Sequence, residues 1–190
     1  MKAVSLKNTD ELTAYVRDGF GARDLTDTRI FQNEVTWTVS RSELIGFLTF
    51  LRDDASCRFT CLSDMTAVDL MTPSNRFAVV YHLKSQFLKR FVRVRTMTDI
   101  DIPVASATSV FPSANWYERE IWDMFGVAFA GNDDLRCLLT DEKFKGEPLR
   151  KDFPVGGEKK LRYDAASGGF YYEPVRAALP ANQAKVTELG

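Results

Sequence analysis

A chain of 190 residues is long enough for one compact domain with an extension, and its 45% hydrophobic and 27% charged residues are typical of a globular protein. The net charge of −1 creates no overall field that would favour nucleic acid or an acidic membrane surface. No apolar run approaches the roughly 20 residues that a membrane helix needs, and the chain starts without the apolar core of a secretory signal. We therefore expect any membrane association to come through other proteins.

The cysteines indicate a reducing compartment. Cys57, Cys61 and Cys137 are odd in number and sparse, which does not suit a disulfide scaffold. A structural zinc or an iron–sulfur cluster normally needs four ligands, and His82 is the only histidine of the chain. We expect the three cysteines to be buried structural residues, with Cys61 pointing inward, and we expect no metal site.

The first 60 residues alternate between helical and strand patterns. Apolar residues at helical spacing predict a helix from Leu12 to Phe20, ended by the glycines that follow. Strict alternation predicts a half-buried strand over residues 34–40. Ser40 and Glu43 have the spacing of a capping box, which predicts a second helix that closes near residue 53.

Three further strands follow along the chain. Residues 58–62, 76–83 and 90–96 are rich in β-branched and aromatic residues, and turn signals separate them at 71–75 and 86–89. The three strands predict an antiparallel meander. With the earlier strand they give a small, mostly antiparallel sheet of about four strands with helices packed on it, an α+β fold.

The segment from 113 to 126 predicts a final helix. Asn115 has the position of an N-cap, Glu118 that of N3, and Gly126 that of the residue after the last turn. One stripe of apolar residues recurs at helical spacing, and the charged residues should lie on the outer face, with Arg119 and Asp123 forming an ordinary ion pair four residues apart.

The character of the chain changes after about residue 130. Seven of the 11 glycines and four of the 7 prolines lie in the last 60 residues, yet leucines and aromatic residues persist there. That much apolar mass does not suit a disordered tail. We therefore expect a compact α+β domain over 1–130 and an extended, loop-rich C-terminal arm over 131–190 that docks on partner subunits.

The sequence holds no complete catalytic set. Glu118, Glu120 and Asp123 could form a carboxylate pair for acid–base chemistry, but on a helix they are better explained as surface charges. His82 lies near no nucleophile signature, and neither Gly-Gly pair lies in a phosphate-binding fingerprint. Nucleic-acid binding is supported only by a basic strand, which contains Arg90, Arg93 and Arg95 beside Phe87 and Phe91. The residues alone indicate a structural or interaction protein, with a free-standing RNA-binding or regulatory domain as the alternative.

Two dense clusters of charged and aromatic residues add a resemblance to these patterns. The motif residues are Glu118, Arg119, Glu120, Asp123, Gly126, Arg136, Pro148, Arg150, Lys151, Asp152, Phe153 and Pro154. On these residues, and on matches from about 33 to 176, the chain resembles the hydrophilic C-type subunit of respiratory complex I (NADH:quinone oxidoreductase). Its mitochondrial counterpart is called NADH dehydrogenase iron–sulfur protein 3. The chain departs from that pattern at Asn132 and Glu147, where the family usually has histidines, and in residues 176–190, which replace an aromatic-rich tail.

The resemblance implies a non-catalytic core structural subunit of the peripheral arm, which scaffolds the quinone-site region while electrons pass from NADH to quinone. It implies that this chain binds no cofactor and that FMN, iron–sulfur clusters and quinone belong to neighbouring subunits. The expected partners are the quinone-site subunit related to hydrogenase large subunits and nearby cluster-bearing subunits, with no nucleic acid and only indirect membrane contact. Arg136, Arg150, Lys151 and Asp152 are expected in ion pairs within or between chains. The expected location is the matrix side of the mitochondrial inner membrane or the cytoplasmic face of a bacterial one.

Overall fold

The computed structural model describes residues 4, 6, 8–21, 25–141, 143–154 and 159–175. The chain divides into two compact units, Met1–Phe144 and Lys145–Gly190. The first unit therefore continues past residue 130, where the sequence predicted the compact domain to end.

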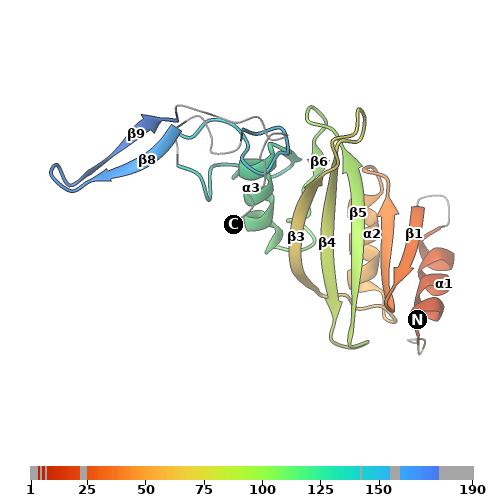
Figure 1. Cartoon of the computed structure of the whole chain (residues 1–190). Helices are drawn as coiled ribbons and strands as arrows, with labels where there is room; N and C mark the ends of the chain where they lie inside the picture. Colours follow the sequence, from red (N-terminus) through yellow and green to blue (C-terminus); the bar gives the residue numbers. More distant parts are fainter. Residues whose placement is uncertain are drawn as a thin grey trace, which may run out of the picture. The chain divides into compact units, whose positions relative to one another are not determined.

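The first unit is built on a five-stranded sheet (Figure 1). Its strands are β1 (Leu25–Phe31), β2 (Glu34–Val39), β3 (Cys61–Asp69), β4 (Phe77–Ser85) and β5 (Arg90–Thr98), in the spatial order β1-β2-β5-β4-β3. Strands β3, β4 and β5 form the predicted antiparallel meander, but its first strand spans Cys61–Asp69 rather than residues 58–62. In contrast, β2 pairs in parallel with β5, with Val35 opposite Val92. The sheet is therefore mixed, and the α+β class is confirmed.

The edge strand β1 was not predicted from the sequence. It pairs antiparallel with β2, with a register irregularity between Leu25 and Asp27. Most of its residues are exposed, and Phe31 retains 72% of its accessible surface. A strand that buries so little of either face has no clear alternation of apolar and polar residues, which is the signal that sequence analysis relies on.

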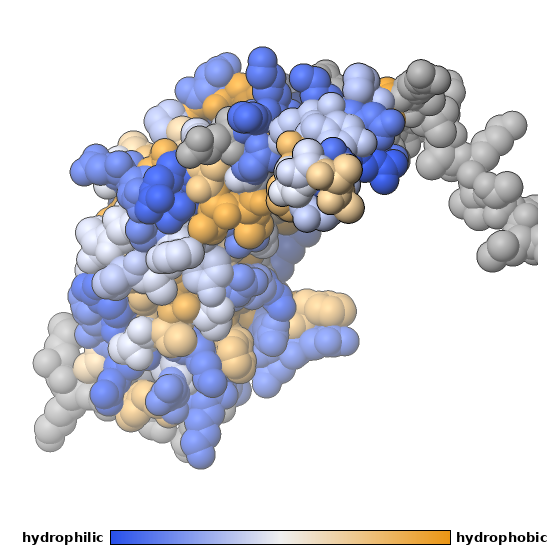
Figure 2. Space-filling model, turned by 90° about the vertical axis from the view of Figure 1, so that its left-hand side faces the viewer, coloured by the Kyte–Doolittle hydropathy of each residue, from blue (hydrophilic) through white to orange (hydrophobic). Residues whose placement is uncertain are grey.

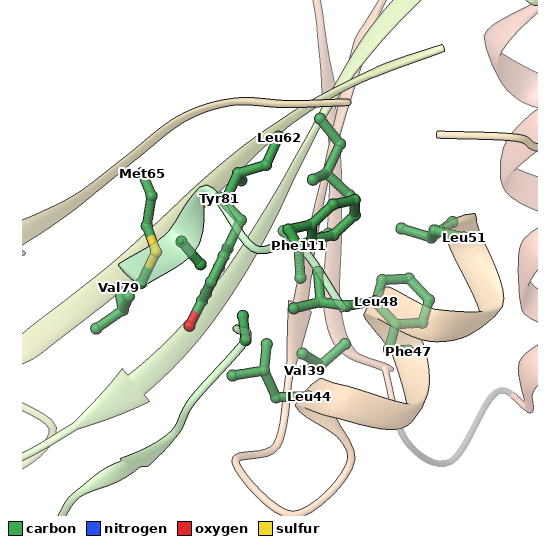
Figure 3. Close-up of a cluster of buried hydrophobic side chains, with 14 of the residues drawn as sticks. Val39, Leu44, Phe47, Leu48, Leu51, Leu62, Met65, Val79, Tyr81 and Phe111 are labelled. Atoms are coloured by element: carbon green, nitrogen blue, oxygen red, sulfur yellow. The ribbon is translucent and has the colours of Figure 1, made fainter. Parts of the chain in front are cut away.

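Three helices pack on one face of the sheet: α1 (Thr9–Phe20), α2 (Leu44–Asp53) and α3 (Ala114–Phe125). The Phe47 ring of α2 lies 5.6 Å from Trp37 of β2 and 4.9 Å from Phe20 of α1. In Figure 3, leucines of α2 face strand residues such as Val39 and Tyr81 across the core. No described helix is both long and apolar enough to cross a membrane.

The helix starts differ from two predictions. The capping box was wrong: residues 41–43 form a turn, Ser40 Oγ lies 3.0 Å from Ser42 Oγ, and α2 begins only at Leu44. Asn115 is not a cap either, because the chain already turns between Phe111 and Ala114, and α3 begins one residue earlier than Asn115. Helix α1 has a regular N-cap, because the Asn8 side chain accepts a hydrogen bond from the Glu11 N–H.

The chain enters and leaves α3 through one small pairing. Strand β6 (Val104–Ala105) runs parallel to β7 (Phe129–Ala130), and Ser106 N–H donates to the Ala130 carbonyl at 2.8 Å. This pairing fixes both ends of the α3 segment. It also holds the start of the loop at 131–141 beside the helix.

The second unit contains a β-hairpin that the sequence analysis missed. Strands β8 (Lys159–Asp164) and β9 (Gly169–Pro174) pair antiparallel, and the turn is closed by Ser167 Oγ donating to Asp164 at 2.6 Å, with Gly168 at φ +68°. In the sequence, the alternation of Leu161 and Tyr163 with polar residues is the pattern that could have indicated strand β8. Both strands of the hairpin are short and mostly exposed, so the signal is weak.

Candidate functional site

Three charged side chains of α3 are buried. Glu118, Arg119 and Asp123 expose 0%, 4% and 6% of their surface, although neighbouring Trp116 exposes 63%. We call these three residues the buried charge cluster. A buried charge is costly unless hydrogen bonds or opposite charges compensate it, so each one must have partners.

Glu118 joins α3 to the segments on both sides of it. Its Oε1 accepts the Ala107 N–H at 2.7 Å, and its Oε2 accepts from Ser106 Oγ and Asn132 Nδ2, both at 2.8 Å. Burial raises the pKa of Glu118 above its ordinary value, and the hydrogen bonds from Asn132, Ala107 and Ser106 act in the opposite direction. The Glu118 carboxyl group therefore links residues 106–107, before α3, to Asn132 in the loop after α3.

Asp123 holds the far end of the same loop. Its Oδ2 accepts the backbone N–H groups of Leu138, Leu139 and Thr140 at 3.0, 2.8 and 2.9 Å, and its Oδ1 accepts the Thr140 hydroxyl. Burial alone would raise the pKa of Asp123, but the bonds from Thr140, Leu139 and Leu138 outweigh burial and lower the pKa below its usual value. The ionised carboxylate is thus the form that the fold favours.

Arg119 supplies the cation of the cluster. Its guanidinium donates to the carbonyls of Arg136 and Cys137 at 3.4 and 3.1 Å and lies 3.7 Å from Asp134 Oδ2. Its other face lies 5.2 Å from the centre of the Trp116 ring. Arg119 therefore satisfies backbone carbonyls of the loop at 131–141 by donating hydrogen bonds to them.

The predicted arrangement of these charges on α3 was wrong. Arg119 contacts the loop at 131–141 rather than pairing with Asp123, and the charges lie inward rather than on an outer face. The helical period could not show this, because the loop covers a second side of α3. Glu120 is half-buried, and Gly126 ends the helix at φ +73°, where its N–H donates to Trp122 O at 2.9 Å. Gly126 thus confirms the predicted helix end.

The geometry does not favour catalysis by the buried charge cluster. Both carboxylates are occupied by donors of the protein itself, so neither has an obvious free oxygen for a substrate. No group of three His, Cys, Asp or Glu residues in the described segments is close enough to hold a metal. Burial beside Asp54 raises the pKa of the Cys57 thiol to about 12, so that this thiol stays protonated. Cys57 is buried as predicted, whereas Cys61 and Cys137 are half-buried.

The second cluster of charged and aromatic residues, at 146–154, lies at the start of the second unit. Gly146 has φ +95°, and a Cβ there would lie 2.9 Å from the Phe153 ring. Arg150 Nη1 lies 3.2 Å from Glu147 Oε2, and the Arg150 side chain is only 14% exposed. Arg150 therefore has an ion pair within this chain, at the position where Glu147 departs from the family pattern. Of the other motif residues in this cluster, Pro148, Phe153 and Pro154 are half-buried, whereas Lys151 and Asp152 are exposed. Arg136 of the first unit is also exposed, and it pairs with Asp134 at 2.7 Å.

Two of the three arginines of strand β5 have described partners on neighbouring strands. Arg93 pairs with Glu34, and Arg95 lies 3.8 Å from Asp27 and donates to Thr38 Oγ1. These contacts reduce the charge that Arg93 and Arg95 could offer to a phosphate backbone.

Comparison with known protein families gives one consistent match. Residues 37–159 match the family described as "Respiratory-chain NADH dehydrogenase, 30 Kd subunit". This range includes the buried charge cluster and residues 146–154, and it ends at the start of β8. It also includes the five-stranded sheet, apart from β1 and the start of β2.

Individual relatives agree with that match. The chain is 47% identical to a C-type subunit of the NADH-quinone oxidoreductase of Rhizobium meliloti over 166 residues, which cover 87% of this chain and 82% of the relative. It is also 47% identical to the C-type subunit of the same enzyme in Rhodobacter capsulatus, covering 82% and 78%. Among solved structures, a chain of the membrane-bound sulfane sulfur reductase, an archaeal respiratory membrane complex, is similar with a TM-score of 0.61 at 25% identity and covers 76% of this chain and 84% of that one.

Proposed function

Because the chain belongs to the family of the 30 kDa subunit of respiratory-chain NADH dehydrogenase, which includes the C-type subunits of NADH-quinone oxidoreductase, we propose that it serves as a non-catalytic scaffold of the peripheral arm. It contributes to NADH:quinone oxidoreduction as a subunit. The observation that supports this role is the use of the α3 carboxylates: their hydrogen bonds hold a loop of the protein in place.

The β8–β9 hairpin is the element that docks on a neighbouring subunit in this proposal. Leu161, Tyr163, Phe170 and Tyr171 expose between 52% and 71% of their surface, and only Tyr163 and Phe170 form a described ring contact, at 5.2 Å. A two-stranded hairpin alone is at best marginally stable in water. Exposed hydrophobic residues gathered on such an element indicate a protein partner that covers them. Figure 2 shows other hydrophobic residues at the surface set among hydrophilic ones.

The partner in this proposal is the quinone-site subunit related to hydrogenase large subunits, together with nearby cluster-bearing subunits. FMN, the iron–sulfur clusters and quinone are held by those neighbours. The chain then lies peripherally, on the matrix side of a mitochondrial inner membrane or the cytoplasmic face of a bacterial one. The family's occurrence in NADH-quinone oxidoreductase and the lack of a membrane-spanning helix among the described residues support this placement.

Truncation after Phe144 tests the docking role. The cut leaves every described partner of the buried charge cluster in place, because these partners lie between Ser106 and Thr140. A cut after Val127 would instead remove Asn132 and the N–H groups that Asp123 binds, so it would test folding. We expect the shorter chain to fold but to leave NADH-quinone oxidoreductase unassembled on native gels.

A full-length variant separates docking from chain length. Replacing Tyr163 and Phe170 by Ser removes apolar surface at the hairpin while keeping its length, and it should lower the amount of assembled complex. Lys159→Gln is the matched control, because Lys159 is an exposed polar residue of the same hairpin. Normal assembly of both the truncated chain and the double variant would exclude the hairpin as a docking element.

A further inference from the structure

The β4–β5 hairpin is rich in cations. Residues 84–93 read Lys-Ser-Gln-Phe-Leu-Lys-Arg-Phe-Val-Arg, with four cations and no carboxylate. The fold adds Arg58, whose guanidinium lies 4.9 Å from the centre of the Phe87 ring. Lys84 Nζ lies 5.4 Å from the centre of the Phe91 ring. We call residues 84–93 with Arg58 the basic hairpin.

Only part of this charge is neutralised within the described structure. Arg93 pairs with Glu34. In the described segments, Arg58, Lys84 and Lys89 show no ion pair with a carboxylate. Arg58 contacts the Phe87 ring, and Lys84 contacts the Phe91 ring. Both rings remain about half exposed, at 50% and 49%. Positive charge and apolar surface are therefore available at the same place.

Several of these side chains lie on the face of the sheet opposite to the helices. In β4 and β5, Leu83 and Val92 point into the core, so the alternating neighbours Lys84, Phe91 and Arg93 project from the other face. Phe91 lies directly opposite Lys84 in the register of the two strands. The ring and the ammonium group thus form one patch on a regular, hydrogen-bonded surface.

We propose that the basic hairpin binds an acidic, extended segment of a neighbouring protein subunit. Carboxylates of that segment would pair with Lys84, Lys89 and Arg58, and its apolar side chains would cover Phe87 and Phe91. The cation–π contacts already restrain Arg58 and Lys84, so these two side chains lose less conformational freedom on binding. A protein partner fits better than a lipid or nucleic-acid surface, because relatives of this chain are subunits of a larger enzyme.

Zero-length cross-linking tests the proposal in the assembled complex. A carbodiimide activates a carboxylate, and a lysine amine within contact distance then displaces the activated oxygen to form an amide, while the reagent leaves as a urea. We expect peptide mass spectrometry to find Lys84 or Lys89 joined to an Asp or Glu of another subunit. Exposed Lys143 lies outside the basic hairpin and is the control. Bonds only to acids of this chain would overturn the proposal.

Lysine reactivity gives a second measurement on the same sample. Acetylation of Lys84 and Lys89 should be slower in the intact complex than in the isolated full-length chain by about tenfold, whereas an unprotected Lys143 keeps its rate. Equal rates in both states, without cross-links to another subunit, would show that the basic hairpin is solvated and would overturn the proposal.

Charge variants show whether the contact is electrostatic. Lys84→Glu with Lys89→Glu should reduce retention of the chain in the complex more than the matching Gln variants, and Lys143→Glu should have no such effect. Stronger retention by phosphatidylglycerol vesicles or single-stranded RNA than by the complex would assign the basic hairpin to those partners instead. The proposal rests on the subunit role, but it fails separately: if hairpin truncation abolishes assembly and the lysine variants do not, only this proposal is wrong.

Discussion

Replacing Asp123 by Asn tests whether the loop at 131–141 is held by the charge of that carboxylate. The carboxylate accepts three backbone N–H groups on Oδ2 and the Thr140 hydroxyl on Oδ1. An asparagine can keep its oxygen towards the three N–H groups and turn its amide nitrogen towards the Thr140 oxygen. The shape and the number of contacts are thus conserved, and mainly the charge is lost.

The expected loss follows from the number of these bonds. A hydrogen bond to a charged group contributes roughly 1.5–3 kcal/mol to stability and a neutral one about 1 kcal/mol. Three backbone bonds would then lose about 0.5–1 kcal/mol each, and the partial exposure of Leu139 and Thr140 reduces the sum. We expect Asp123→Asn to lower the free energy of unfolding by about 2 kcal/mol at pH 7.

Urea unfolding of the full-length chain, followed by circular dichroism, measures this difference. Asp133→Asn is the matched control, because Asp133 is an exposed residue of the same loop, and it should change stability by less than about 0.5 kcal/mol. The lowered pKa of Asp123 adds a signature: its stabilisation is present above the unfolded pKa and is lost as pH falls through the folded pKa. The cost of Asp123→Asn should therefore shrink below about pH 4. A cost equal to that of Asp133→Asn would refute the reasoning.

Three further predictions use other positions. Burial raises the pKa of Glu118, so its stabilisation is present below the unfolded pKa and is lost as pH rises through the folded pKa. In urea titrations, the stability of the wild type relative to Glu118→Gln should therefore fall as pH rises above about 4. Asn132→Asp would place a second carboxylate where the amide now donates to Glu118, and it should destabilise by about 2 kcal/mol or more at pH 7 and less at pH 4, with Asp133→Asn again the control. Gly146→Ala should speed limited proteolysis within 145–154, because φ is +95° and the new Cβ would approach Phe153; Gly168→Ala, with φ +68° and no atom within 4 Å of the Cβ, separates the clash from the backbone strain.

Local patterns identified most of the first unit. The helix that ends near Phe20, the strand around Trp37, and strands β4 and β5 each have a clear sequence pattern in a short window, and all are present. The strand expected at 58–62 lies further along the chain, at Cys61–Asp69. The partners of β2 could not be read this way. Its parallel pairing with β5 joins Val35 to Val92, far apart in the sequence, and no local period specifies such a pairing.

The buried charge cluster shows the same limit. The motif singled out Glu118, Arg119 and Asp123, but the sequence did not predict that their side chains are buried under a loop. Glu118 and Arg119 are adjacent in the sequence and project from different sides of α3, so a helical pattern can bury only one of them against the sheet. Both are buried because the loop at 131–141 closes over the second side, and that closure depends on Asn132 and on backbone groups near Cys137.

The parallel pairing of β2 with β5 has a consequence for the order of folding. During synthesis the β1–β2 hairpin and α2 emerge first, but β2 has no inner neighbour until the chain has grown past Thr96, its last partner in the register. The meander of β3, β4 and β5 is local and can form as a unit, whereas its junction with β2 closes a long loop and carries most of the entropic cost. The inner backbone edge of β2 therefore stays unpaired until β5 has been made, and an unpaired strand edge favours aggregation.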